Sequence, residues 1–376
     1  MNMPEITTII LAGGTASRMR PLSLNQTKCM IPFLGKPLIF HLINSLKAYG
    51  FTDLVLTSKG RRGEIKEYFS MGKKWGLKIR YYKGKKWFGT AGTIKELVAQ
   101  MNKKISDPFM VIYGDSLLRV DYSKMLKFHY QKKSKATLLY HRPDFASFLY
   151  EYHDKQYERR GKRTNYGVMD ITQEDKIIKA KEKPTLGDIK RNFIDPVANA
   201  TVHIFDKEIL NYIPTDEPFD FPRDLFPLLT KKGQKCYGYN IGDGYRIDIG
   251  TIRHYYDTQF DILNRNIIFD INLPELENGI WVGAKSKIKS LHGLKKPVLI
   301  GEKCRISSRN TIDCSIIGNN VRIGNDTLIT GSIILDGVQI GDKVNISHCI
   351  IGENTVINNG VIVPPNSVLG DWCHVG

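Results

Sequence analysis

Isoleucine and valine recur at a fixed interval through the last quarter of the chain. Between residues 300 and 363 the apolar steps run six, six and five, so that every seventeenth residue is equivalent. β-branched residues at a period near six, separated by polar turns, are typical of a parallel β-helix, whose coils point one apolar side chain per face into a shared core. The apolar positions are Ile300, Ile306, Ile312, Ile317, Ile323, Ile329, Ile334, Ile340, Ile346, Ile351, Ile357 and Val363. The repeat therefore predicts a solenoid here, with Val368 opening a further turn and Gly283 marking an earlier one.

The first two thirds of the chain follow a different pattern. Strand-like and helix-like segments alternate, which indicates an α/β fold with a mostly parallel sheet and helices on both faces. The expected strands are 7–11, 53–57, 77–82 and 109–113, and the expected helices are 37–49, 63–69 and 93–101. Because the pattern changes near residues 265–280, we predict one domain over residues 1–265 and a β-helix over residues 266–376.

The composition restricts the environment and the partners. The net charge is +17, but its lysine and arginine pairs are spread along the whole chain without interleaved aromatic residues, so we expect no nucleic-acid partner. No apolar run is long enough to span a membrane, and the N-terminus lacks the basic region of a signal peptide. The six cysteines form no C-x-x-C pair. These features predict a cytoplasmic protein with reduced thiols and no membrane partner.

The segment from Leu11 to Pro21, L-A-G-G-T-A-S-R-M-R-P, carries the first chemical signal. A strand followed by Gly13 and Gly14 lets backbone N–H groups approach phosphate oxygens closely. The positively charged guanidinium group of Arg18 could donate hydrogen bonds to the same phosphate. Lys28 is a second candidate phosphate ligand, although a lysine standing alone is usually a solvated surface residue. The P-loop pattern G-x-x-x-x-G-K-[ST] is absent, which disfavours an ordinary kinase or ATPase.

Together these segments resemble the signature of the sugar-1-phosphate nucleotidylyltransferases, G-G-x-G-[ST]-R-[LM]-x-P-L-[ST] followed by P-K-P-[LM]-[VI]-P. Ala16 replaces the family's third glycine, and Thr27 and Cys29 replace the prolines beside the lysine. The resemblance continues in order through F-G-T-A-G-T (88–93), V-I-Y-G-D (111–115), Y-G-V (166–168), E-K-P (182–184), N-A-T-V-H-I-F (199–205) and Y-R-I-D-I-G-T (245–251). It is greatest for mannose-1-phosphate guanylyltransferases that carry a C-terminal left-handed β-helix.

The resemblance implies a Rossmann-like nucleotidyltransferase domain followed by a left-handed β-helix, and it assigns roles to residues. Arg18, Lys28 and Lys183 would bind phosphate, and Asp115 and Asp248 would bind Mg²⁺. The nucleotide-binding residues would be Leu11, Ala12, Gly13, Gly14, Gly89, Thr90, Ala91 and Gly92, and the sugar-binding residues Gly167, Glu182 and Asn199. Taken alone, Asp115 could form a turn and Asp248 could cap a helix.

The implied reaction agrees with these residue types. A sugar phosphate is already a nucleophile, so catalysis needs cations that neutralise two polyanions rather than a strong base. We expect the substrates to be GTP and mannose 1-phosphate. Two alternatives remain open, namely a glucose-1-phosphate thymidylyl- or uridylyltransferase and a non-catalytic regulatory subunit of the same two-domain plan.

Three further features of the sequence bear on partners and on rival functions. The open end of the β-helix predicts a homo-oligomer. The basic, aromatic segment 145–165 could cover the sugar pocket, contact another subunit or form a solvated hairpin. His348 would suit an acyltransferase, but the repeat runs through it without an insertion, so we interpret it as structural.

Overall fold

The computed structural model describes residues 5–14, 16–57, 64–84, 88–142, 164 and 166–376. Most of the basic, aromatic segment 145–165 lies outside these residues. Contacts group the chain into two units, Met1–Gly13 with Leu42–Ile247 and Gly14–His41 with Asp248–Gly376. The second unit is thus discontinuous, because a short N-terminal segment folds with the C-terminal part.

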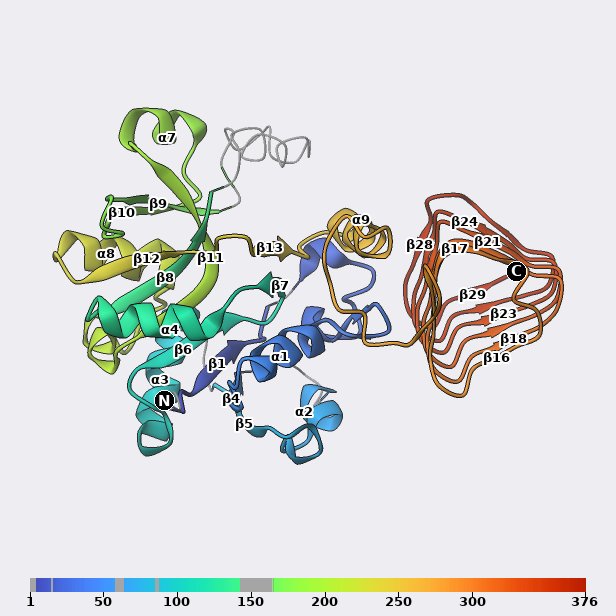
Figure 1. The fold of residues 1–376 in the computed structure, drawn as a ribbon, viewed down its shortest axis with the longest axis horizontal. Coiled ribbons are helices and arrows are strands. Elements are labelled where there is room, and N and C mark those ends of the chain that lie inside the picture. Colours follow the sequence, from blue (N-terminus) through green and yellow to red (C-terminus); the bar gives the residue numbers. More distant parts are fainter. Residues whose placement is uncertain (1–4, 15, 58–63, 85–87, 143–163, 165) are drawn as a thin grey trace. The chain divides into compact units, whose positions relative to one another are not determined.

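A mixed, nine-stranded sheet forms the centre of the first unit among the described residues (Figure 1). Its main order is β10 (Ile177–Glu182), β9 (Gly167–Ile171), β11 (Pro196–Phe205), β6 (Phe109–Tyr113), β1 (Thr8–Leu11), β4 (Asp53–Thr57) and β5 (Lys78–Tyr82). β8 (Ala136–His141) joins β11 to β12 (Cys236–Asn240). The strands β6, β1, β4 and β5 are parallel, and β11 runs antiparallel to β6. The predicted α/β class is confirmed.

Helices connect these strands, and their bounds are close to those expected from the sequence. Within the described residues the α-helices are α1 (Leu38–Ala48), α2 (Glu64–Phe69), α3 (Gly89–Met101), α4 (Tyr122–Gln131), α7 (Leu186–Asn192), α8 (Phe226–Lys231) and α9 (Ile252–Leu263). Other helical segments of the described chain are the 3₁₀ helices η1 (Ser17–Met19), η2 (Lys28–Met30), η3 (Lys73–Trp75), η4 (Asn102–Lys104) and η5 (Lys207–Tyr212) and the π-helix η6 (Phe221–Leu225). The helix expected at 93–101 begins four residues earlier, so the G-T-A-G sequence forms its first turn.

The sheet is buried on both faces, which explains why its strands read as continuous apolar runs. Ile9 belongs to one buried cluster with Ile94 and Leu97 of α3. Its neighbour Ile10 points to the opposite face and is equally buried. Parallel strands covered on both sides lack the alternation of polar and apolar residues that marks half-exposed strands.

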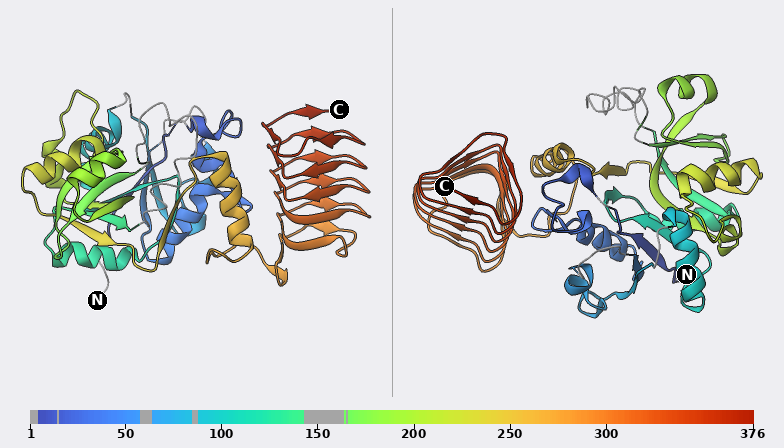
Figure 2. Two further views of the ribbon diagram at one scale, coloured as in Figure 1. Left: turned by 90° about the horizontal axis from the view of Figure 1, so that it is seen from above. Right: turned by 180° about the vertical axis from the view of Figure 1, so that it is seen from behind.

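The C-terminal part of the second unit is a stack of parallel coils (Figure 2). Strands of successive coils pair in register, as in the column Ile306, Ile323, Ile340 and Ile357. The strands are β14 (Glu275–Glu277), β15 (Ile280–Val282), β16 (Lys287–Ile288), β17 (Leu294–Ile300), β18 (Arg305–Ile306), β19 (Thr311–Ile317), β20 (Arg322–Ile323), β21 (Leu328–Thr330), β22 (Ile333–Ile334), β23 (Gln339–Ile340), β24 (Asn345–Ser347), β25 (Ile350–Ile351), β26 (Val356–Ile357), β27 (Ile362–Val363), β28 (Val368–Leu369) and β29 (His374–Val375).

The repeat of isoleucine and valine is the core of this stack. All of the apolar positions predicted from the period, from Ile300 to Val363, are at most 4% exposed. The earlier coil marked by Gly283 is also present, since β15 pairs in parallel with β17. From Ile300 to Val363 the sequence period therefore corresponds to one coil for every seventeen residues, whereas the coils before and after take eighteen, because Val282 pairs with Ile300 and Ile351 pairs with Leu369. Leu369, and not the predicted Val368, is thus the next residue that packs on the core.

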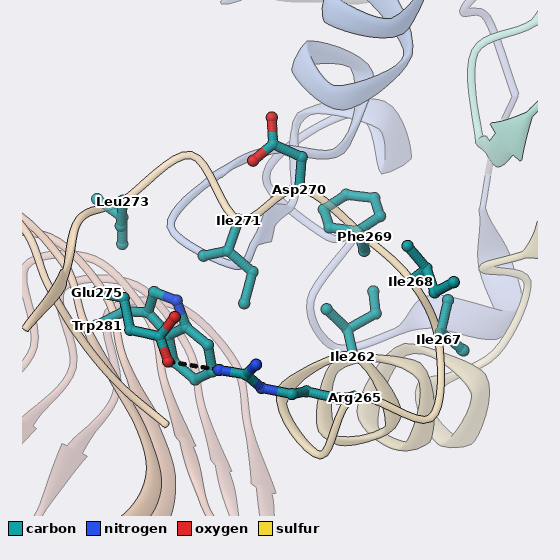
Figure 3. A pocket seen from close by; sticks show the side chains of 10 residues that line it. All are labelled: Ile262, Arg265, Ile267, Ile268, Phe269, Asp270, Ile271, Leu273, Glu275 and Trp281. Atoms are coloured by element: carbon teal, nitrogen blue, oxygen red, sulfur yellow. Dashed lines mark hydrogen bonds and ion pairs between the residues drawn. The ribbon is translucent and has the colours of Figure 1, made fainter. Parts of the chain in front are cut away.

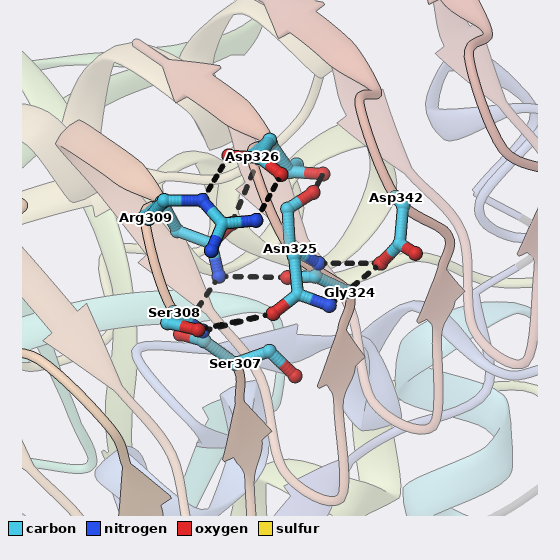
Figure 4. A network of polar contacts seen from close by, with 9 residues as sticks. Ser307, Ser308, Arg309, Gly324, Asn325, Asp326 and Asp342 are labelled. Atoms are coloured by element: carbon cyan, nitrogen blue, oxygen red, sulfur yellow. Dashed lines mark hydrogen bonds and ion pairs between the residues drawn. The ribbon is translucent and has the colours of Figure 1, made fainter.

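Polar side chains close the corners between the strands. Asn325 accepts a hydrogen bond from the Ser308 hydroxyl at 3.1 Å, and its backbone N–H donates to Asp342 Oδ1 at 2.6 Å (Figure 4). Beside it, the Arg309 guanidinium binds both carboxylate oxygens of Asp326 at 2.6 and 2.7 Å. Such ladders satisfy backbone donors that the irregular corners would otherwise leave unpaired.

Neither a disulfide nor a membrane span is found in the described chain. All six cysteines are free thiols. Among the described residues, no helix combines the length and the apolar character needed to cross a bilayer.

Candidate functional site

Two of the sequence motifs lie side by side at the ends of β1 and β6. Leu11 is in register with Tyr113, and the backbone N–H of Gly114 donates to the Leu11 carbonyl at 2.9 Å. A Cβ atom on Gly114 would lie 3.2 Å from the same carbonyl oxygen, a tight contact that favours glycine in the turn before Asp115. Neighbouring parallel strands thus bring the first glycine-rich turn to the G-D turn, at the sheet edge where α/β folds bind ligands.

Arg18, Lys28 and Asp248 lie together in the second unit. Lys28, on η2, places its Nζ 3.4 Å from Asp248 Oδ1, at the end of β13 (Tyr245–Asp248). The Lys28 side chain is only 9% exposed, whereas that of Asp248 is 32% exposed. A Cβ atom on Gly250 would lie 3.2 Å from Arg18 Nη2 and 3.4 Å from both Asp248 carboxylate oxygens. The side chains of Arg18, Lys28 and Asp248 therefore lie close together beside Gly250. The absence of a side chain on this glycine leaves space for the Arg18 guanidinium and the Asp248 carboxylate.

The G-T-A-G sequence packs backbone to backbone against a later segment. Gly89 has a φ of +72°, and a Cβ atom there would lie 2.4 Å from the Phe219 carbonyl oxygen. Thr90 donates to Asp220 Oδ1 from its backbone N–H at 2.7 Å and from its hydroxyl at 3.0 Å. The glycine is thus required by a contact within the chain, and the expected contact of Gly89, Ala91 and their neighbours with the nucleobase stays a prediction.

The predicted sugar-binding residues lie on three adjacent strands. Gly167 of β9 is in register with Glu182 of β10, and β11 carries Asn199 on the other side of β9. A Cβ atom on Gly167 would lie 2.9 Å from Glu182 Oε2 and 3.8 Å from Asn199 Cβ. Lys183 Nζ lies 3.7 Å from Glu182 Oε1. The structure therefore brings all four residues together.

Burial dominates the electrostatics of Glu182. Desolvation raises the pKa of its carboxyl, Lys183 and Arg246 oppose this effect, and Asp220 adds to it. A partly desolvated carboxylate flanked by cations suits hydrogen bonding to neutral hydroxyls beside a phosphate.

Sequence reasoning missed three residues of this region. Arg246 stacks on the Tyr166 ring at 5.0 Å, and Asp220 holds Thr90. Tyr166 and Arg246 stand inside the motifs Y-G-V and Y-R-I-D-I-G-T, directly beside residues that were singled out. Asp220 lies in no quoted motif, and only its contacts reveal it.

Comparison with known proteins decides the family. Residues 7–265 match the nucleotidyl transferase family over more than half of the chain. The chain belongs to the nucleotidyl transferase family. Residues 277–376 match the LbH domain, a left-handed β-helix, of EIF2B subunit epsilon. The match agrees with the left-handed coil that the resemblance predicted.

Similar proteins of the family carry different names. A UTP–glucose-1-phosphate uridylyltransferase of Synechocystis sp. is 27% identical over 82% of this chain and 82% of its own length. A mannose-1-phosphate guanylyltransferase of Mycobacterium tuberculosis is 26% identical over 69% of this chain and 65% of its own length. A glucose-1-phosphate adenylyltransferase of Acetivibrio thermocellus is 27% identical over 83% of this chain and 73% of its own length.

The carboxylates of this nucleotidyl transferase fit a divalent metal by their chemistry. Asp115 follows β6 in the first unit, and Asp248 belongs to the second unit. The described residues hold no group of three or more histidine, cysteine, aspartate or glutamate residues that could bind a metal ion. Mg²⁺ needs no such group, because it binds through one or two carboxylates together with substrate phosphates. The pairing of Asp115 with Asp248 stays a prediction.

A pocket of about 400 Å³ lies elsewhere in the second unit of this nucleotidyl transferase (Figure 3). Most of its lining residues are apolar, and the Arg265 guanidinium contacts the Glu275 carboxylate at 2.6 Å. The lining residues are Ile262, Arg265, Ile267, Ile268, Phe269, Asp270, Ile271, Leu273, Glu275 and Trp281. None of the predicted site residues lines this pocket, so it is separate from the proposed chemistry.

Proposed function

We propose that this nucleotidyl transferase joins a sugar 1-phosphate to a nucleoside triphosphate with Mg²⁺ as the cofactor. A phosphate oxygen of the sugar 1-phosphate attacks the α-phosphorus, and the bond to the β-phosphate breaks, so that pyrophosphate leaves. The observation that best supports this proposal is the convergence of Arg18, Lys28 and Asp248 in one unit and of Gly167, Glu182, Lys183 and Asn199 in the other.

The roles of the residues follow from their charges. Arg18 and Lys28 neutralise the triphosphate, and Lys183 holds the phosphate of the sugar. Glu182 accepts hydrogen bonds from the sugar hydroxyls, Asn199 both accepts and donates them, and Gly167 leaves space for the sugar. Asp115 and Asp248 would hold Mg²⁺, which would supply positive charge to offset the negative charge on the α-phosphate.

Mannose 1-phosphate with GTP is our proposed substrate pair. The G-T-A-G sequence and the similarity to a mannose-1-phosphate guanylyltransferase support it. We expect this pair to give the highest kcat/KM, by about tenfold or more, corresponding to roughly 1.4 kcal/mol of transition-state discrimination. Pyrophosphate release should be measured for GTP, UTP, dTTP and ATP against mannose and glucose 1-phosphates. A preference for glucose 1-phosphate with UTP, dTTP or ATP would overturn the pair and leave the reaction class intact.

A regulatory subunit is the second candidate, and one finding favours it. The coil matches the LbH domain of a subunit named EIF2B epsilon. The presence of Arg18, Lys28, Asp115, Lys183 and Asp248 favours catalysis instead. A complete absence of pyrophosphate release across the substrate panel, with nucleotide binding retained, would support the regulatory function.

We propose a homo-oligomer that associates through the last coils of the β-helix. Ile362 and Trp372 are 72% and 68% exposed there, and Leu369 and Val375 are only partly buried. Replacing Ile362 and Trp372 by Asp should lower the molar mass measured by light scattering, because buried charges oppose association. Leu276→Asp, an exposed position in β14, is the control. A monomeric unaltered chain, or an unchanged mass for the double variant, would contradict the proposal.

A further inference from the structure

One corner position in each coil from residue 302 onward is acidic or an amide. The residues at this position, which we call the acid column, are Glu302, Asn319, Asp336, Glu353 and Asp371, spaced by about one coil each. Hydrogen bonds run along the column. Asn319 Oδ1 accepts from the Glu302 N–H, Asp336 Oδ1 accepts from the Asn319 N–H, and Asp371 Oδ1 accepts from the Glu353 N–H, all at 2.8–2.9 Å.

The N-terminal segment 25–36 makes contact with the acid column at both of its ends. Lys36 Nζ donates to Glu302 Oε1 at 2.7 Å. Asn319 Nδ2 donates to the Gly35 carbonyl at 3.1 Å. At the other end, the Gln26 amide donates to Glu353 Oε1 at 3.4 Å and the Asn25 amide donates to Asp371 Oδ2 at 3.5 Å. The segment therefore runs opposite to the column, across a height of roughly 19 Å for coils about 4.8 Å apart.

Helix α9 contacts the later part of the same segment. Gln259 Oε1 accepts from the backbone N–H of Leu34 at 2.9 Å, and the Tyr255 hydroxyl donates to the Pro32 carbonyl. The neighbouring Tyr256 hydroxyl donates to the Gly331 carbonyl of the coil. The segment is thus tied to the β-helix both directly and through α9.

Lys28 lies inside the segment that these contacts hold. It is nearly buried beside Asp248, so a shift of the surrounding backbone would change where its ammonium points. We propose that the acid column is a positioning element for triphosphate binding, with Glu302, Glu353 and Asp371 acting on the substrate through Lys28. This inference rests on the proposed function. Every candidate catalytic residue lies before residue 252, so the sequence alone predicts that changes in the β-helix affect assembly before chemistry. The contacts of the acid column predict instead that such changes also affect triphosphate binding.

The pair Lys36–Glu302 allows a direct test. Lys36 hydrogen-bonds Glu302 and lowers the pKa of its carboxyl. We expect Lys36→Met and Glu302→Gln each to raise KM for the nucleoside triphosphate about fivefold to tenfold, with kcat changed by less than about threefold. The double variant should be no worse than either single variant, because both remove the same contact. The matched control is Arg309→Met with Asp326→Asn, an ion pair of the coil that is outside the column.

Hydrogen exchange provides a readout that needs no activity. A full-length triple variant should combine Glu302→Gln, Glu353→Gln and Asp371→Asn. The backbone amides of residues 25–36 should exchange faster in this variant than in the unaltered protein, and the same amides should exchange at the unaltered rate in the Asp326→Asn variant. If the triple variant keeps both its exchange rates and its KM, the positioning role is wrong. If the unaltered protein turns over no substrate pair, the proposed function fails, and exchange alone decides whether the column holds the segment.

Discussion

Replacing Asp115 or Asp248 by Asn should lower kcat/KM about a thousandfold, the largest effect that we expect from a single substitution. Asparagine keeps the size of the side chain but removes the charge that, in our proposal, binds Mg²⁺. Because the metal would offset charge that develops on the α-phosphate, its loss should cost several kcal/mol, roughly 4 kcal/mol for a thousandfold change. Turnover should be followed by pyrophosphate release at saturating Mg²⁺.

Asp243→Asn is the matched control for these two variants. Asp243 is exposed and lies five residues before Asp248, so this substitution makes the same change in net charge outside the motif. Thermal unfolding should show that all three variants are folded. Turnover near that of the unaltered protein in either folded variant would remove that residue from the metal site, and such turnover in both would refute the two-aspartate mechanism.

Replacing Ile329 by Ala should destabilise the β-helix by about 2–5 kcal/mol. Ile329 is fully buried and stacks between Ile312 and Ile346 of the neighbouring coils. The substitution removes buried methyl groups and leaves a cavity, since in-register coils cannot close around one shortened side chain. The urea concentration at the midpoint of the coil's unfolding transition should be compared with that of the unaltered protein.

Leu328→Ala is the control for this substitution, because Leu328 precedes Ile329 on the same strand but is 39% exposed. Its midpoint should move much less, since little apolar surface is lost from the core. Equal shifts for the two variants would mean that inward and outward positions contribute alike, and this result would contradict the core assigned from the seventeen-residue period.

The coil is the part of the fold that the sequence predicts best, and the reason is physical. Each coil has to bury one apolar side chain on each of its faces, so one period identifies every inward position from Ile300 to Val363. In the sheet, Asp53–Thr57 and Phe109–Tyr113 have the predicted bounds because turn residues flank buried runs. The sequence did not predict that β11 joins the parallel strands in the antiparallel sense, because the direction of a strand depends on how the distant chain connects it.

The site was predictable where a motif fixes local geometry. Gly167, Glu182 and Asn199 were found from three short motifs, and the structure places them on adjacent strands. Asp220 was not found, because its contact with Thr90 joins residues 130 positions apart and leaves no local pattern. The acid column is a second example. Its period is visible in the sequence, but its contacts with residues 25–36 are not, because they join residues that are far apart in the chain.

The discontinuity of the second unit has a consequence for how the protein is made. Residues 14–41 leave the ribosome more than two hundred residues before α9 and the coil, with which they fold. A chain still under synthesis therefore carries Arg18 and Lys28 without Asp248 and without the partners that hold their segment. Such long separations in sequence slow folding and leave unfinished surfaces exposed. The order of synthesis itself therefore delays the folding of this unit, and with it the approach of Lys28 to Asp248, until the last coils are translated.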